Sequence, residues 1–260
     1  MKNSENFSGH LIGHTEKIRH TENSRVGSRS ETDDSNINRR DKSRLSTSDK
    51  YRTKEPIKLR SAFVLFSRQY NFWLLGIALI FFAAIRFYFY RISYVDLITV
   101  LLTLVFQPFV EWLIHIFLLH FKPKRLFSFT YEPLVAKMHR MHHEDPKNLR
   151  LVFVPKSVMT ALVLGSVVVP IQLLPRTQAS TLIVTLLAIL LYYEWIHFLI
   201  HSSYRPKHKI YKTIWRAHRL HHYRNENYWF GVVTNFADKA LGTSPNKSEV
   251  PLSPTARSLI

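Results

Sequence analysis

Ten of the 14 histidines in this chain fall into four groups whose spacing suits metal binding. Along the sequence the groups read H-x4-H, H-x2-H-H, H-x3-H and H-x2-H-H. Their members, in chain order, are His115, His120, His139, His142, His143, His197, His201, His218, His221 and His222. Residues three or four apart share one face of an α-helix, and neutral imidazole is the commonest protein ligand for metals. The groups therefore predict sets of metal ligands on helix faces.

The number of histidines predicts two metal ions, because one ion takes roughly four to six ligands and ten imidazoles would supply about five to each of two. The pattern also repeats. H-I-F-L-L-H followed by H-R-M-H-H resembles H-F-L-I-H followed by H-R-L-H-H, so two halves of the chain contribute equivalent sets. One spacing is irregular: His115 and His120 are five residues apart. At ~100° per residue, a helix must either bend or end between them.

The other four histidines are interpreted as ordinary surface residues. His10, His14 and His20 lie in a polar N-terminal stretch, and His208 stands alone in a basic loop. A lone histidine without a ligand-spaced neighbour carries no metal prediction.

A glutamate-tryptophan pair precedes each half of the histidine pattern, at Glu111 and Glu194. Glu194 and His197 match the E-x-x-H motif of carboxylate di-iron proteins. That class needs two such motifs and two further glutamates, and Glu111 lies four residues before His115 rather than three. Both glutamates are therefore expected to orient histidines instead of binding metal.

The histidines are attached to apolar segments that predict a membrane protein. A helix needs roughly 20 apolar residues to cross a bilayer, and the candidate stretches are 72–90, 97–119, 158–174 and 182–200. Arg86, near the end of the first stretch, is expected to extend toward the headgroups. Amphipathic helices are expected at 131–143 and 209–222, each ending in a histidine cluster. The expected fold is an all-α, multi-pass membrane domain with about four transmembrane helices, capped on the cytoplasmic side by helices that carry a dimetal site.

The charge pattern orients these spans. The chain has a formal net charge of +18, and its basic residues gather before the first span, between the second and third, and after the fourth. Because basic loops stay in the cytoplasm, both termini and all four histidine groups are expected there. The membrane is a bacterial inner membrane or the endoplasmic reticulum. Basic residues that flank apolar runs do not favour nucleic-acid binding, and no nucleic acid is expected as a partner.

Composition bounds the chemistry and the domains. The chain has no cysteine, which excludes disulfides, iron–sulfur ligation and thiolate catalysis. Residues 1–60 are too polar to bury a core, so they are expected to form a disordered basic tail, and no cleavable signal peptide is visible. A membrane catalytic domain is expected over 61–243 and a flexible C-terminal tail over 244–260.

The histidine order resembles the fatty acid hydroxylase and sterol desaturase superfamily, and most closely the catalytic domain of fatty acid 2-hydroxylases. Three segments between Phe63 and Thr243 support the resemblance. They are E-W-L-I-H-I-F-L-L-H-F-K-P at 111–123, R-L-V-F-V-P at 150–155 and F-G-V-V-T-N-F-A-D-K-A-L-G-T at 230–243.

The resemblance implies a non-haem di-iron oxygenase that hydroxylates a lipid acyl chain taken from the bilayer, using O2 and two electrons. Zinc could replace iron in a purified sample. No residue apart from the ligands is expected to act as a catalytic base. Asp238 is expected to have a structural role, or to contact the metal ligands without binding metal itself. The implied ligands are His115, His120, His139, His143 and His221 for one metal, and His142, His197, His201, His218 and His222 for the other.

Three alternatives remain open at the level of the sequence. The same boxes serve hydroxylases or desaturases of carotenoids and sterols. A non-catalytic metal-binding membrane scaffold would keep the fold without the reaction. A transporter would place its polar groups near the midplane of several spans, whereas here they gather at one end. The eukaryotic 2-hydroxylases carry a haem-binding cytochrome b5 domain that the tail here does not resemble, so electrons are expected from a separate cytochrome b5, ferredoxin or similar protein.

Overall fold

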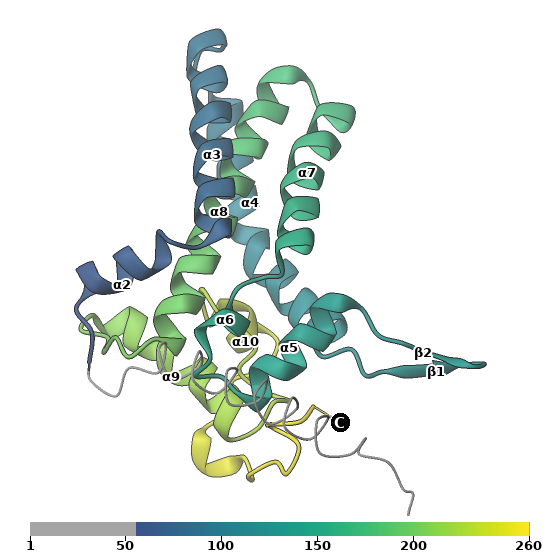
Figure 1. The fold of residues 1–260 in the computed structure, drawn as a ribbon. Helices are drawn as coiled ribbons and strands as arrows, with labels where there is room; N and C mark the ends of the chain where they lie inside the picture. Colours follow the sequence, from purple (N-terminus) through teal and green to yellow (C-terminus); the bar gives the residue numbers. More distant parts are fainter. Residues whose placement is uncertain (1–55, 260) are drawn as a thin grey trace, which may run out of the picture. The chain divides into compact units, whose positions relative to one another are not determined.

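The computed structural model describes residues 56–259. These residues form a predominantly helical unit with one small sheet (Figure 1). The elements are α2 (Leu59–Phe66), α3 (Tyr70–Phe89), α4 (Tyr94–Leu113), a π-helix (Ile114–Leu119), β1 (Lys124–Leu126), β2 (Phe129–Tyr131), α5 (Leu134–Glu144), α6 (Leu149–Val152), α7 (Lys156–Leu173), α8 (Arg176–His201), α9 (Lys209–Tyr223), α10 (Phe236–Ala240) and a 3-10 turn (Lys247–Glu249).

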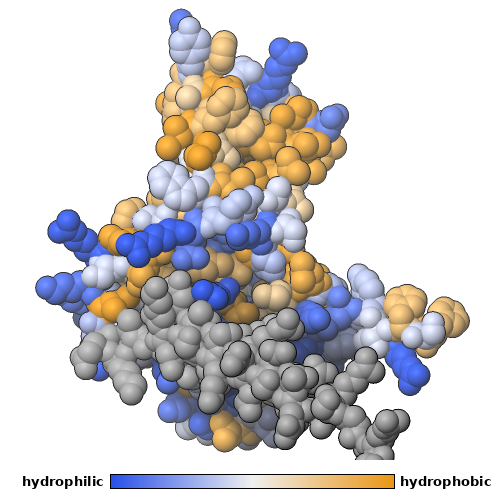
Figure 2. Space-filling model, viewed as in Figure 1, coloured by the Kyte–Doolittle hydropathy of each residue, from blue (hydrophilic) through white to orange (hydrophobic). Residues whose placement is uncertain are grey.

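The four predicted spans are confirmed as helices. Within the described residues, α3, α4 with its π-helix, α7 with α6, and α8 are long and apolar enough to cross a membrane, with mean hydropathies of 1.9 to 2.1. They run side by side as a stalk (Figure 1), and Figure 2 shows apolar residues covering it. Helix α8 is the central one, because half of its apolar window is buried, against 11 to 17% for the other three. The protein is therefore an integral membrane protein organised around α8.

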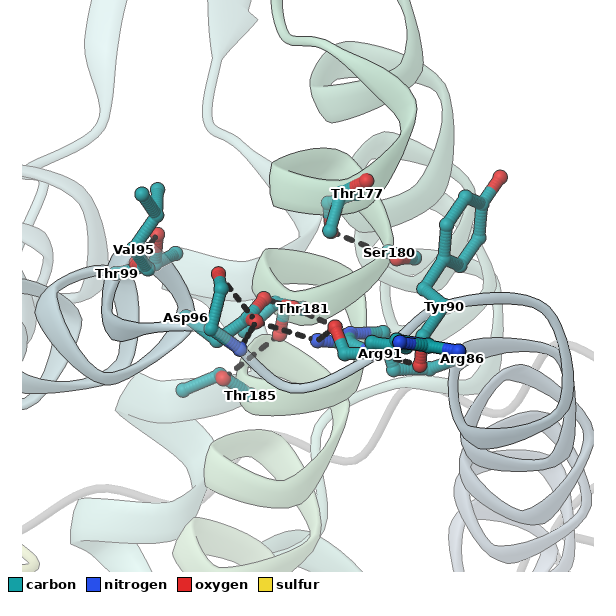
Figure 3. Close-up of polar contacts among 11 residues, drawn as sticks. Arg86, Tyr90, Arg91, Val95, Asp96, Thr99, Thr177, Ser180, Thr181 and Thr185 are labelled. Atoms are coloured by element: carbon teal, nitrogen blue, oxygen red, sulfur yellow. Dashed lines mark hydrogen bonds and ion pairs between the residues drawn. The ribbon is translucent and has the colours of Figure 1, made fainter.

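The end of the stalk farthest from the histidines is tied by a buried polar cluster (Figure 3). Arg86 of α3 pairs with Asp96 of α4 at 2.6 Å, and its Nε donates to the Thr181 hydroxyl of α8 at 2.7 Å. Thr181 in turn donates to Asp96 at 2.5 Å. Arg86 is only 3% exposed, so the expected extension toward the headgroups is wrong. A carboxylate on the neighbouring helix holds the guanidinium inside instead.

The cap below the stalk contains α5, α9, α10 and the C-terminal residues, and α6 lies where the span of α7 meets it (Figure 1). The two amphipathic helices are present, and α9 begins where predicted. Helix α5 begins at Leu134 rather than at Tyr131, because Pro133 can precede a helix but Tyr131 belongs to an antiparallel hairpin. This hairpin is the exception to the predicted all-α fold. Elsewhere the expectation of membrane helices with a helical, histidine-bearing cap is confirmed.

The C-terminal residues differ from the flexible tail expected over 244–260. Val250, Ala256 and Leu259 are buried. The Arg224 side chain donates to the carbonyl of Val250 at 2.7 Å, and Arg257 donates to the carbonyl of His143 at 2.7 Å. These buried apolar side chains and hydrogen bonds hold the segment against the histidine helices. The sequence of this segment has no periodic apolar pattern from which the packing could be predicted. The disordered tail predicted for residues 1–60 lies almost wholly outside the described residues.

Candidate metal centre

The fold gathers the ten patterned histidines into two clusters at the junction of the stalk and the cap. The first cluster is His115, His120, His139, His143 and His221, and the second is His142, His197, His201, His218 and His222. Within each cluster, one ring nitrogen from every residue lies within 4.8 Å of the others. Each cluster draws on both halves of the sequence, since His221 joins the first and His142 joins the second. His208 lies outside both clusters, at the exposed start of α9.

A π-helix explains the irregular spacing of His115 and His120. The last turn of α4 widens at Ile114–Leu119, and the amide of His120 donates to the carbonyl of His115 at 3.1 Å. This is an i to i+5 bond, so residues five apart come to lie over one another. The ring centroids of the two histidines are 4.9 Å apart. The helix therefore does not bend; it widens and then ends at His120.

The distances inside the second cluster fit imidazoles that converge on a cation. The Nε2 atom of His201 lies 3.2 Å from that of His142 and 3.0 Å from that of His218. The Nε2 atoms of His218 and His222 are 3.1 Å apart. Two nitrogens that bind one ion at about 2.1 Å and at right angles to each other are roughly 3.0 Å apart. The first cluster contains one such pair, with 3.1 Å between the Nε2 atoms of His139 and His143.

Several buried ring nitrogens find no hydrogen-bond partner anywhere in the described chain. In the first cluster they are the Nε2 atoms of His115, His120 and His221. A buried polar atom without a partner is costly, and a metal ion would satisfy these atoms. The ligand chemistry of both clusters therefore fits transition-metal ions such as iron or zinc.

The histidines of the cap are held in the neutral form that binds metal. Burial and the neighbouring imidazoles keep the pKa values of His139, His142, His218 and His222 well below the ordinary value. The pKa of His143 falls to about 3 because the ring is buried. Its ring lies 4.0 Å, centroid to centroid, from that of His222 in the second cluster. The two clusters are thus adjacent, and their unprotonated rings pack together without charge repulsion.

Backbone carbonyls fix the orientation of several rings. The Nδ1 atom of His115 contacts the carbonyl of Phe230 at 2.5 Å, and that of His221 contacts the carbonyl of Tyr228 at 2.8 Å. His143 and His201 make the same kind of contact with Ala256 and Pro146. When Nδ1–H donates to a carbonyl, Nε2 is left as the free acceptor that can bind metal. These contacts select the tautomer that points Nε2 into each cluster.

The two glutamates act on backbone segments rather than on histidines directly. Glu111 accepts hydrogen bonds from the amides of Val232 and Val233, close to the Phe230 carbonyl that holds His115. Glu194 accepts from the amide of Val154 at 3.0 Å.

The second half resembles this arrangement, because the His197 ring donates a hydrogen bond to the backbone of Val152, two residues before Val154. Each glutamate thus fastens the strip of chain that holds a histidine on its own helix. The expectation that the glutamates orient histidines is refined: one backbone segment stands between carboxylate and ring in each half.

Asp238 fastens the same strip from its other side. Its carboxylate accepts hydrogen bonds from the amides of Phe230 and Gly231 at 2.9 and 2.7 Å, and from the Thr243 hydroxyl at 2.7 Å. A Cβ on Gly231 would lie 2.0 Å from the carbonyl oxygen of Thr234, so only glycine fits there. Burial raises the pKa of Asp238, while these hydrogen bonds act in the opposite direction. The strip 230–233 is therefore clamped between Glu111 and Asp238.

Sequence patterns did not reveal the carbonyl partners of the rings. Tyr228, Pro146 and Ala256 contribute main-chain oxygens, and every residue type has one. For Phe230, the neighbouring F-G-V-V segment gave a signal, because a glycine between apolar residues suggests close backbone contact. For Ala256 there was none.

Comparisons with known proteins agree with this site. A family model described as fatty acid hydroxylase matches residues 100–243. A dihydroceramide fatty acyl 2-hydroxylase of Arabidopsis thaliana is 29% identical over 136 residues, which is 52% of this chain and 55% of the relative. The human fatty acid 2-hydroxylase is 32% identical over 141 residues, 53% of this chain and 37% of the relative. The chain thus matches about half or less of the length of these relatives.

The fold also has a counterpart among solved structures. It superposes on the hydroxylase domain visible in full-length scs7p with a TM-score of 0.57 and 21% identity, over 70% of this chain and 69% of the other. Four membrane helices topped by two buried five-histidine clusters define a membrane protein with a candidate dinuclear metal centre. Because the family model matches more than half of the sequence, the chain belongs to the fatty acid hydroxylase family.

Proposed function

We propose that this protein is a non-haem di-iron monooxygenase that hydroxylates a lipid acyl chain at the carbon next to its carboxyl or amide carbon. The observation that carries the proposal is the pair of buried five-histidine clusters beside membrane helices. The named activities of the Arabidopsis and human relatives, dihydroceramide fatty acyl 2-hydroxylation and fatty acid 2-hydroxylation, supply the reaction and the substrate class.

Each cluster would hold one metal ion. His115, His120, His139, His143 and His221 would bind the first, and His142, His197, His201, His218 and His222 the second. Imidazole suits iron, and zinc would compete during purification. When bound, the two metal ions would use O2 and two electrons to break a C–H bond of the substrate. Electrons would come from a carrier such as a cytochrome b5 or a ferredoxin.

The chain's own residues orient and shield this chemistry. The carbonyls of Phe230, Tyr228 and Ala256 hold ring nitrogens in place. Seven of the ten rings, for example His143 and His218, are no more than 5% exposed, which keeps water away from reactive species. No buried side chain outside the two histidine clusters is needed as a base.

The substrate would reach the site from the bilayer. Leu113, Phe117 and Leu118 flank His115 and His120 and are 41 to 66% exposed. They lie on the membrane span itself, so lipid acyl chains would cover them. An acyl chain lying along this surface has its polar end near the cap, which places the carbon next to that end closest to the histidines.

The cap and termini would face the cytoplasm, because the basic loops lie on that side. The membrane would be the endoplasmic reticulum or a bacterial inner membrane. The basic cap could also attract an acidic electron carrier.

Mass spectrometry of lipids tests the proposal. The wild type, His142→Ala, His221→Ala and the control His208→Ala would be expressed in a host with a compatible reductase. We expect 2-hydroxy acyl lipids with the wild type and with His208→Ala, whose histidine lies outside the clusters, and none with the other two. If oxygen were added to a carotenoid or sterol instead, that lipid class would be the substrate in place of the acyl chain. Bound metal with no product in any lipid class would favour a scaffold.

A further inference from the structure

The β1–β2 hairpin exposes apolar side chains, and only its base contacts another ring, that of Phe121 beside Tyr131, within the described residues. Its strands pair only with each other, in a two-stranded sheet, and Figure 1 shows it projecting sideways from the molecule, across the direction of the membrane helices. Leu126, Phe129 and Tyr131 are 42 to 57% exposed, and Phe127 at the tip is 96% exposed. An isolated two-stranded hairpin is at best marginally stable in water, so its apolar side chains call for a partner.

The strand register makes the hairpin amphipathic. Lys124 faces Tyr131 and Leu126 faces Phe129, while Arg125 faces Thr130. Because alternate residues point to opposite faces, one face carries Leu126, Phe129 and Tyr131 with Lys124 at its base, and the other carries Arg125 and Thr130. Figure 2 shows apolar residues gathered at the end of this projection beside hydrophilic ones. The tip and one face are thus mostly apolar, with Lys124 at the base of that face, while the other face is polar.

The backbone at the tip is strained, and the exposed Phe127 side chain makes little packing contact that would offset the strain. Phe127 has a φ of 52°, a left-handed conformation that is an outlier for a bulky residue. Strain of this kind persists where surrounding structure or a partner stabilises it. The conformation displays the aromatic ring outward, which suits a ring that inserts into another phase.

The charge of the hairpin points to an anionic partner. Lys122, Lys124 and Arg125 lie within four consecutive positions, and no acidic residue occurs between Glu111 and Glu132. Glu132 itself is paired with Arg140 at 2.7 Å. Lys124 also begins the hairpin only five residues after the membrane span ends at Leu119, so the hairpin starts next to the bilayer surface.

We propose that the β1–β2 hairpin is a membrane anchor: Phe127 and the Leu126–Phe129 face insert among the headgroups of anionic phospholipids, and Lys122, Lys124 and Arg125 bind their phosphates. Tyrosine favours the membrane interface, exposed phenylalanines gain by leaving water, and basic residues are attracted to an anionic lipid surface. Arg140 links the hairpin base to α5, next to His139. The anchor would therefore also fix the histidine helix relative to the membrane.

The absence of cysteine makes the test direct. Single-cysteine variants Phe127→Cys, Phe129→Cys and Thr130→Cys would each carry an environment-sensitive fluorophore, in full-length protein reconstituted into vesicles of phosphatidylcholine with phosphatidylserine. Ser248→Cys, exposed on the cap away from the hairpin, is the water-exposed control. We expect a blue shift and quenching by spin-labelled lipids at 127 and 129, much less at 130 on the polar face, and none at 248.

Charge reversal separates electrostatic docking from simple proximity. In the Phe127→Cys background, Lys122→Glu, Lys124→Glu and Arg125→Glu together should remove most of the blue shift in phosphatidylserine vesicles. Vesicles of phosphatidylcholine alone should give a weaker shift even with the original lysines and arginine. Circular dichroism and gel filtration would establish that each variant is folded.

Two results would overturn the proposal. One is water-like fluorescence and quenching by aqueous iodide at 127 and 129 in every vesicle. The other is a shift that appears only when an electron-carrier protein is added, which would make the hairpin a protein-docking element. Neither outcome depends on the oxygenase proposal, because the signals require no turnover.

Discussion

Helices α4 and α8 carry a buried polar cluster at each end, and the two clusters are satisfied in opposite ways. At the far end, Asp96 and Thr181 pair with Arg86 within the chain. At the cap end, His115 and His197 keep buried ring nitrogens without any partner in the described residues. Buried polar groups are costly unless they are paired. The Arg86–Asp96–Thr181 cluster is therefore satisfied within the chain, whereas the histidine nitrogens at the cap end could be satisfied by a metal ion.

The largest expected effect breaks the cap cluster itself. His142→Ala and His221→Ala remove one proposed ligand from each metal, and we expect product to fall below detection in both. If the partition is right, each variant loses about one of two ions, because a five-nitrogen site with a gap binds weakly. Metal analysis of the purified proteins measures this. Loss of both ions from either single variant would indicate one shared site instead of two.

Breaking the far cluster should harm folding but not the metal. Arg86→Met removes the cation that pairs with the buried Asp96 carboxylate, which costs about 3–5 kcal/mol. The double variant Arg86→Met with Asp96→Leu leaves no unpaired charge and should recover most of that loss. Thermal unfolding in detergent and metal content are the measurements. A fall in metal per folded chain equal to that of His142→Ala would contradict the division of labour between the ends.

Removal of the metal should destabilise the histidine clusters and leave the Arg86–Asp96–Thr181 cluster unaffected. Chelation is expected to lower the free energy of unfolding by about 2.7 kcal/mol or more if metal was present at 100 times its Kd. The Arg86→Met, Asp96→Leu protein should lose as much as the wild type, since its histidines are unchanged. Differential scanning calorimetry with and without chelator measures the melting temperatures that test this. An unchanged melting temperature would mean that the histidine clusters do not hold structural metal.

The smallest effect concerns the clamps on strip 230–233. Glu111→Gln and Asp238→Asn place an amide donor where backbone amides already donate. Loss of such support typically costs about 10–100-fold in metal affinity or activity. Competition with a metal-binding dye would show weaker binding. Glu249→Gln, which changes an exposed carboxylate in the 3-10 turn Lys247–Glu249 away from the strip, is the matched control. An equal loss of metal affinity in all three variants would show that strip 230–233 has no special role in metal binding.

The histidine-bearing elements could be predicted because their signals are local. Apolar runs long enough to span a bilayer and histidines at helical spacing are properties of short segments. The bounds of α7 and α9 therefore fell close to the prediction. The hairpin was missed because its strands are three residues each, too short for a periodic pattern, and the C-terminal packing was missed because it rests on backbone oxygens.

The sequence by itself determined four spans, ten clustered histidines and the likeness to a hydroxylase family. The spacing of the histidines did not decide which rings meet; the family resemblance implied it, and the tertiary structure brings His221 to His115 and His142 to His201. It also turned Arg86 inward and widened α4 into a π-helix at His115. The physical reason is that helical periodicity fixes which side chains share a face, whereas the facing of one helix to another depends on packing between segments far apart in the chain.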